Sequence, residues 1–139
     1  VQLEGRVPTL HGGWQRGRTM GVPTANVDVE AGMIFPSKGV FAGRVLVAGR
    51  WYRSAVNVGH NPTFQSRVDE TAVVRIEAHL LDFSGDLYGK RIRVDFLHKI
   101  RDERRFESVP ALVAQMRRDI QAAGSLADPA LEAIGLRPS

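Results

Sequence analysis

Alternating apolar and polar residues run through the middle of this chain and predict β-strands. The alternation occurs in four segments, 39–48, 51–58, 71–82 and 91–98. In the first segment Phe41, Val45 and Val47 fall on one face, and Gly49-Arg50 predicts a hairpin turn into the second. Short strands with glycine-rich turns, and no helices between them, favour an antiparallel β-barrel.

The segment 71–82 is the longest strand candidate and has two different faces. Its even positions are apolar: Val74, Ile76, Ala78 and Leu80. Its odd positions include Arg75, Glu77 and His79, which is typical of a half-buried strand with one face toward solvent or a ligand. Glu77 could accept a proton from a substrate hydroxyl, or it could be an exposed acid paired with Arg75 or a neighbouring strand.

The C-terminal part of the chain changes to a helical period. Apolar residues recur at Leu112, Val113, Met116 and Ile120. Ser108 is a good N-cap for this helix, and Gly124 is its expected end. A second short helix is expected from a cap at Asp128 to Gly135. We therefore expect one domain over 1–139, with the barrel at about 3–100 and the helical part at about 107–136.

Composition narrows the classes of function. The chain has 139 residues, 43% of them hydrophobic, which suits a single folded domain. Its 19 basic and 15 acidic residues give a net charge of +4, which suits an anionic partner. The absence of cysteine excludes disulfides, cysteine-ligated metals and thiol nucleophiles. No signal peptide or membrane-length apolar run is present, so we expect a cytoplasmic protein without a membrane partner.

The segment 21–26 carries a candidate cation site. Thr24 and Asn26 are two residues apart, so on an extended chain they point the same way, and Pro23 stiffens the backbone before them. Neutral oxygen ligands beside a basic, glycine-rich loop suit Mg²⁺ shared with a nucleotide polyphosphate. The loop itself, 12–21, matches no P-loop. On its composition alone it could equally be a surface loop with solvated arginines.

The charged segment 100–106 joins the last predicted strand to the helix. It could be a linker with Phe106 packed into the core. It could also be a loop that closes over an aromatic ligand, with arginines at its rim and Phe106 in apolar contact.

Six sequence blocks together resemble the riboflavin kinase family. They are 17–26 (GRTMGVPTAN), 39–42 (GVFA), 57–64 (NVGHNPTF), 76–83 (IEAHLLDF), 86–89 (DLYG) and 100–106 (IRDERRF). Their order and spacing cover about residues 5–123. The resemblance implies a six-stranded antiparallel Greek-key β-barrel with a C-terminal helix. It also implies transfer of the γ-phosphoryl group of ATP to the ribityl 5′-hydroxyl of riboflavin, giving FMN and ADP.

The resemblance also implies a role for each of several residues. Glu77 would be the catalytic base, and Thr24 and Asn26 would hold Mg²⁺ and phosphate. The residues implied in ATP binding are Gly12, Gly17, Arg18, Gly21, Thr24, His79, Leu80, Asp82 and Tyr88. Those implied on the flavin side are Arg101, Arg104, Phe106 and Ala111.

In many bacteria this kinase is the C-terminal half of a bifunctional enzyme whose N-terminal half adenylylates FMN. The chain lacks a His-x-Gly-His nucleotidyltransferase signature, so we expect kinase activity alone, from a module of a bifunctional parent. The main alternative is a basic barrel that binds single-stranded nucleic acid. Such proteins carry stacking aromatics where this chain has Arg75, Glu77 and His79, so we expect no nucleic-acid partner. A flavin-binding barrel without kinase activity would not need Thr24, Asn26 and Glu77 together.

Overall fold

The computed structural model describes residues 2–6, 24–27, 38–59, 75–87 and 89–136. The predicted ATP-loop residues Gly12, Gly17, Arg18 and Gly21 lie outside these ranges, as does Tyr88. The same holds for the first part of the predicted strand, 71–74.

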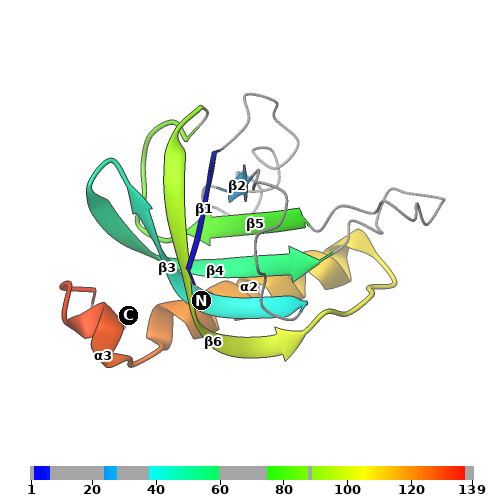
Figure 1. The fold of residues 1–139 in the computed structure, drawn as a ribbon. Helices are drawn as coiled ribbons and strands as arrows, with labels where there is room; N and C mark the ends of the chain where they lie inside the picture. The colour runs from blue at the N-terminus through cyan, green and yellow to red at the C-terminus, as the bar shows by residue number, and fades with distance from the viewer. Residues whose placement is uncertain (1, 7–23, 28–37, 60–74, 88, 137–139) are drawn as a thin grey trace.

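In the part of the chain that the structure describes, six antiparallel strands form one sheet. They are β1 (Gln2–Arg6), β2 (Thr24–Val27), β3 (Gly39–Val47), β4 (Arg50–Gly59), β5 (Arg75–Leu80) and β6 (Arg91–Asp102). Their order is β1-β6-β3-β4-β5-β2 (Figure 1). Because β6 returns to lie beside β3 after the β3-β4-β5 meander, these four strands form a Greek key. The predicted mainly β, antiparallel class is therefore confirmed.

The β3–β4 hairpin turns one residue earlier than predicted. Val47 pairs with Arg50, so the two-residue loop is Ala48-Gly49 rather than Gly49-Arg50. The backbone φ angles of Ala48 and Gly49 are 49° and 81°. A loop with two positive φ angles matches the right-handed twist of the flanking strands, which explains the position of the turn.

The inner face of the sheet encloses the hydrophobic core. The apolar residues that alternate along β3 and β6 lie in it, including Val45 and Val94 at 0% exposure. Phe41 and Phe96 meet edge to face across neighbouring strands, with ring centroids 5.4 Å apart. In β5, Ile76, Ala78 and Leu80 are buried in the same core, so the predicted two-faced strand is confirmed over these residues.

Strand β6 is longer and more irregular than its sequence pattern predicts. It continues to Asp102, and its register against β3 shifts twice, which leaves Leu97 and Ile100 without an opposed residue. Each extra residue is a β-bulge, which bends the strand and moves the following side chains to the other face. As a result Asp95, His98 and Arg101 share the outer face at spacings of three rather than two.

Helix α2 (Val109–Ser125) lies against the outer face (Figure 1). Ser108 caps it as predicted, because its Oγ accepts a hydrogen bond of 3.2 Å from the amide of Ala111. The helix crosses the sheet over two alanines, Ala42 and Ala55, which pack with Ala123. The helix ends at Ser125, so the predicted end at Gly124 falls within its last turn.

The short helix α3 (Pro129–Glu132) follows α2 and is capped by Asp128, as predicted. It ends before Gly135, whose φ of 82° lies in the turn that follows. Neither helix of the described residues is long and apolar enough to cross a membrane.

Candidate active site

A single row of paired residues crosses five strands of the sheet. Asn26 of β2 is paired with Glu77 of β5, and Glu77 with Asn57 of β4. Asn57 is paired with Val40 of β3, and Val40 with Arg101 of β6. Directly paired positions of antiparallel strands belong to the same face of a sheet. The row therefore connects the metal, base and flavin candidates of the sequence on the outer face.

The neighbouring row contains the second metal candidate. It runs from Thr24 through His79, Ala55 and Ala42 to His98. His79 is only 3% exposed. The polar face of β5 is therefore not open to solvent at this position. Helix α2 packs over the alanines of this row, and it shields the middle of the outer face from solvent.

The proposed base and nucleotide residues of β5 differ in exposure. Glu77 is half-buried, between Ile76 and Ala78, which face the core. Leu80 is itself a core residue at 0% exposure. Asp82 is exposed in the turn after β5, with φ at 57°. It lines an open cavity of about 320 Å³ together with Trp51 and Arg53 of β4.

The described residues contain no cluster of three or more His, Asp or Glu side chains able to hold a metal. The predicted cation site has a different chemistry, because its donors would be the neutral oxygens of Thr24 and Asn26. Their positions lie opposite His79 and Glu77, so a carboxylate belongs to the same patch of the sheet. Hard oxygen donors of this kind fit Mg²⁺.

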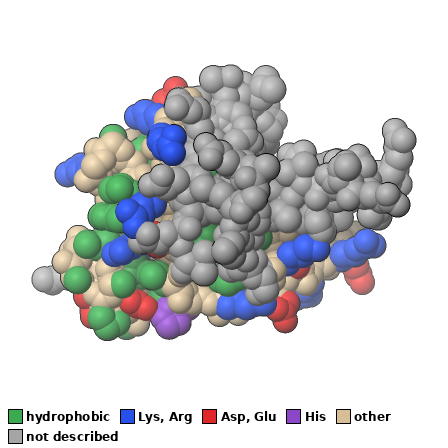
Figure 2. All heavy atoms as spheres, viewed as in Figure 1, with side chains coloured by type: hydrophobic (Ala, Val, Ile, Leu, Met, Phe, Trp, Pro, Cys, Tyr) green, Lys and Arg blue, Asp and Glu red, His purple; other side chains and the backbone are tan. Residues whose placement is uncertain are grey.

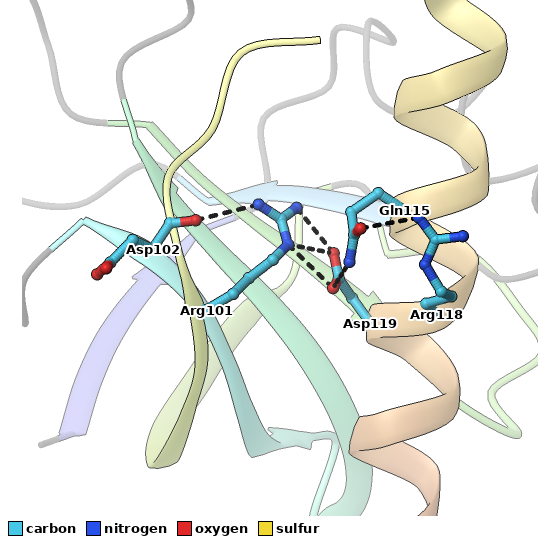
Figure 3. Close-up of polar contacts among 5 residues, drawn as sticks. All are labelled: Arg101, Asp102, Gln115, Arg118 and Asp119. Atoms are coloured by element: carbon cyan, nitrogen blue, oxygen red, sulfur yellow. Dashed lines mark hydrogen bonds and ion pairs between the residues drawn. The ribbon is translucent and has the colours of Figure 1, made fainter.

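Arg101, a flavin-side candidate, is bound along its edge by a buried carboxylate (Figure 3). Its Nε donates to both Asp119 oxygens at 3.0 Å, and Nη2 donates to Oδ2 at 2.8 Å. Its Nη1 donates to the carbonyl of Asp102 at 3.1 Å. Asp119 comes from α2 and is 3% exposed, so this pair ties the helix to the end of β6.

Three of the four flavin-side candidates meet at one aromatic ring. The guanidinium carbons of Arg101 and Arg104 lie 5.5 Å and 5.2 Å from the centroid of the Phe106 ring. Phe106 is half-buried and belongs to neither hydrophobic cluster, so its ring is not packed into the core. Ala111 lies nearby in sequence, exposed in the first turn of α2.

The sequence reasoning missed a second set of contacts, which we call the C-terminal clamp: Arg44, Arg53 and His98. Arg53 is 6% exposed and donates to the carbonyls of Ala123 at 3.0 Å and Leu136 at 2.8 Å. Burial lowers the pKa of Arg53, and the nearby carboxylates of Glu132 and Asp128 oppose that shift. No motif marks Arg53, which is a charged residue at the start of a buried stretch of β4.

The other clamp residues hold the segment around α3. Arg44 bonds Asp95 at 2.8 Å and donates to the carbonyl of Ala130 at 2.8 Å. His98 Nε2 lies 2.6 Å from Asp128 Oδ2. The amide of Ala130, followed by His98, holds the pKa of Asp128 below its usual range.

Comparison with known proteins assigns the chain to a family of kinases. A family profile described as "Flavokinase: Riboflavin kinase" matches residues 1–127. The chain is 39% identical over 114 residues to the bifunctional riboflavin kinase/FMN adenylyltransferase of Bacillus subtilis, covering 82% of this chain and 35% of that protein. The chain therefore belongs to the riboflavin kinase family, whose reaction is the phosphorylation of riboflavin to FMN with ATP.

Two solved structures are similar in fold. A macrolide-efflux protein from Streptococcus pneumoniae matches with a TM-score of 0.74 and 34% identity, over 91% of this chain and 39% of that one. The riboflavin kinase of Trypanosoma brucei matches with a TM-score of 0.58 and 24% identity, over 97% of this chain and 82% of that one. The chain spans 35% and 39% of the length of the first two curated relatives, the bifunctional enzymes of Bacillus subtilis and Pseudomonas fluorescens.

Proposed function

We propose that this chain transfers the γ-phosphoryl group of Mg-ATP to the ribityl 5′-hydroxyl of riboflavin. The observation that carries the proposal is the cross-strand row, in which Asn26 is paired with Glu77 and which ends at Arg101 beside Phe106. Family membership and this geometry point to the same reaction.

The length of the row suits an extended substrate. Glu77 and Arg101 are separated by three strand-to-strand steps, which is about 14 Å along the sheet. A compact substrate would not reach both ends. Riboflavin has the length to span this separation, with its ring at Phe106 and its ribityl 5′-hydroxyl at Glu77.

Glu77 acts as the general base in this proposal. Its carboxylate orients the 5′-hydroxyl and accepts the proton when that O–H bond breaks. The 5′-oxygen forms the bond to the γ-phosphorus, the bond from that phosphorus to the β–γ bridging oxygen breaks, and ADP leaves. Phosphoryl transfer depends mainly on positioning and charge neutralisation, so one oriented carboxylate is sufficient protein chemistry.

Thr24 and Asn26 would hold Mg²⁺ on the same patch of the sheet. Neutral ligands leave the full charge of a bound Mg²⁺ available to neutralise the phosphates. Gly12, Gly17, Arg18 and Gly21 would cradle the phosphates, and His79, Leu80, Asp82 and Tyr88 would lie along the nucleoside. These assignments rest on the sequence blocks of the family.

The same proposal includes closure of the sheet into a six-stranded barrel, with β1 and β2 as the strands that approach. The continuous inner core and the two bulges of β6 support closure, because bulges curve a sheet.

The length of the relatives supports a kinase module of a bifunctional protein. Basic and acidic side chains are interspersed on the face seen in Figure 2, which favours a small-molecule kinase over a nucleic-acid binder.

The test is an assay of the chain with riboflavin, ATP and Mg²⁺, in which FMN and ADP are separated by chromatography. The proposal predicts equal amounts of FMN and ADP, and loss of both when a chelator removes the metal. ADP without FMN, or no product from folded protein, would contradict it.

A further inference from the structure

We infer that Asp119 is a positioning residue for riboflavin binding, acting through Arg101 and Phe106. This inference rests on the proposed function. In this inference Asp119 does not touch the substrate itself. Arg101 is held in place by its hydrogen bonds and is not a free cation.

The hydrogen bonds of Arg101 use three of the five N–H groups of its guanidinium and fix the orientation of the group. Asp119 and the carbonyl of Asp102 accept from Nε, Nη1 and Nη2. The side chains of Arg101 and Asp119 are 17% and 4% exposed. The guanidinium carbon lies over the Phe106 ring, 5.5 Å from its centroid. An arginine whose edge is held by a carboxylate can still interact with an aromatic ring through its planar guanidinium.

The charge balance fits a neutral ring. The isoalloxazine of riboflavin carries no net charge at neutral pH, so an unpaired guanidinium beside it would lose water without gaining a counter-ion. Asp119 supplies that counter-ion from inside the protein. Arg101 can then support the Phe106 ring without selecting for an anionic flavin.

Asp119 is itself held in place by its own helix. Gln115 Nε2 donates to Asp119 Oδ1 at 3.0 Å, and Arg118 donates to Gln115 Oε1 at 2.9 Å (Figure 3). A small cavity between the sheet and α2 is lined by Asp119, Arg101 and Asn57. Because Asn57 is paired with Glu77, the network around Asp119 adjoins the row that carries the base.

The first test is Asp119→Asn, which keeps the shape and removes the charge. We expect the KM for riboflavin to rise about tenfold, as expected for the loss of a charged hydrogen-bonded partner, while the KM for ATP changes less than about twofold. An unchanged riboflavin KM in this variant would overturn the inference.

A second variant separates positioning from simple docking of α2. In Arg101→Met with Asp119→Leu, apolar side chains replace the buried pair, an exchange that often preserves stability. We expect the unfolding temperature of this double variant to be close to that of the wild type, while its riboflavin KM stays raised as in Asp119→Asn. If the KM recovers along with stability, the pair serves only to dock the helix, and the inference is wrong.

His98→Gln is the matched control, because His98 also links β6 to the C-terminal segment, through Asp128. We expect its riboflavin KM to equal that of the wild type, and a rise matching that of Asp119→Asn would overturn the inference. Failure of the proposed function is distinguishable, since wild-type protein would then form no FMN at all.

Discussion

Strands β5 and β6 both present polar residues on the outer face of one sheet, but the two sets of residues have different surroundings. On β6, His98 bonds Asp128, the cap of α3, and Arg101 bonds Asp119 of α2. On β5, Glu77 and His79 are paired in register with the two metal candidates of β2. The comparison teaches that a charge on a polar sheet face cannot be assigned to a ligand until its neighbours on other elements are known.

Among residues of the C-terminal clamp, Arg53→Met should have the largest effect on stability. The carbonyl of Ala123 is among the last four of α2, which lack donors within the helix, so Arg53 caps the helix. Its positive charge also interacts favourably with the negative C-terminal end of the helix dipole. We expect the free energy of unfolding in urea to fall by about 2 kcal/mol. The exposed Arg50→Met, on the same strand, should change it by less than about 0.5 kcal/mol.

If the two regions are distinct, Arg53→Met should retain its turnover at saturating substrates below its unfolding transition. Loss of turnover in protein that is still folded would break the comparison, because an anchoring residue would then be part of the chemistry.

In the other region, around β2 and β5, Asn26→Ala or Thr24→Ala should weaken binding of Mg-ATP about tenfold in calorimetry, the effect of losing one oxygen donor to a shared cation. Riboflavin binding without nucleotide should change much less. With a chelator present, variant and wild type should bind ATP alike. Equal Mg-ATP affinity in variant and wild type would remove these residues from the cation site.

Acid should loosen the clamp through Asp128. Its folded pKa is lowered, so the unfolded state takes up the proton first, and the stabilisation is complete above the ordinary Asp pKa of about 4. It is lost as pH falls through the folded value. We expect urea midpoints to drop more steeply between about pH 5 and 3 in wild type than in Asp128→Asn. Parallel profiles would show that Asp128 carries no such linkage.

The smallest effect concerns the β3–β4 turn, which belongs to neither region. Ala48 has a φ of 49°, which glycine adopts without the clash of a Cβ atom. Ala48→Gly should therefore stabilise the protein by about 0.5 kcal/mol, whereas Ala122→Gly, within helix α2, should destabilise it by about 1 kcal/mol. Destabilisation by Ala48→Gly would contradict this account of the turn.

Local chemistry allowed much of the fold to be predicted from sequence. Alternation identified the core side of β5, and Ser108 and Asp128 were recognisable as caps because capping depends on neighbouring residues. The bulges at Leu97 and Ile100 could not be predicted, because they are defined by the register against β3.

The roles of the candidate site residues stay predictions, and the sequence selected only residues that belong to a motif. Motif spacing selected Glu77 and Phe106, but not Asp119, whose partner Arg101 lies 18 residues earlier. Arg53 was missed for the same reason, since its acceptors lie 70 and 83 residues later in the chain. Long-range pairings of this kind depend on how α2 packs on the sheet, and no local pattern encodes them.

The most direct test of the central claim is the turnover of Glu77→Gln at saturating riboflavin and Mg-ATP, with its unfolding temperature measured in parallel. Glutamine keeps the shape of the side chain but cannot accept the proton, so turnover should fall by about 10²- to 10⁴-fold while riboflavin binding and the unfolding temperature stay close to wild type. Glu132→Gln, an exposed acid on α3, should have no effect on turnover. Near-wild-type turnover in folded Glu77→Gln would contradict the assignment of Glu77 as the base.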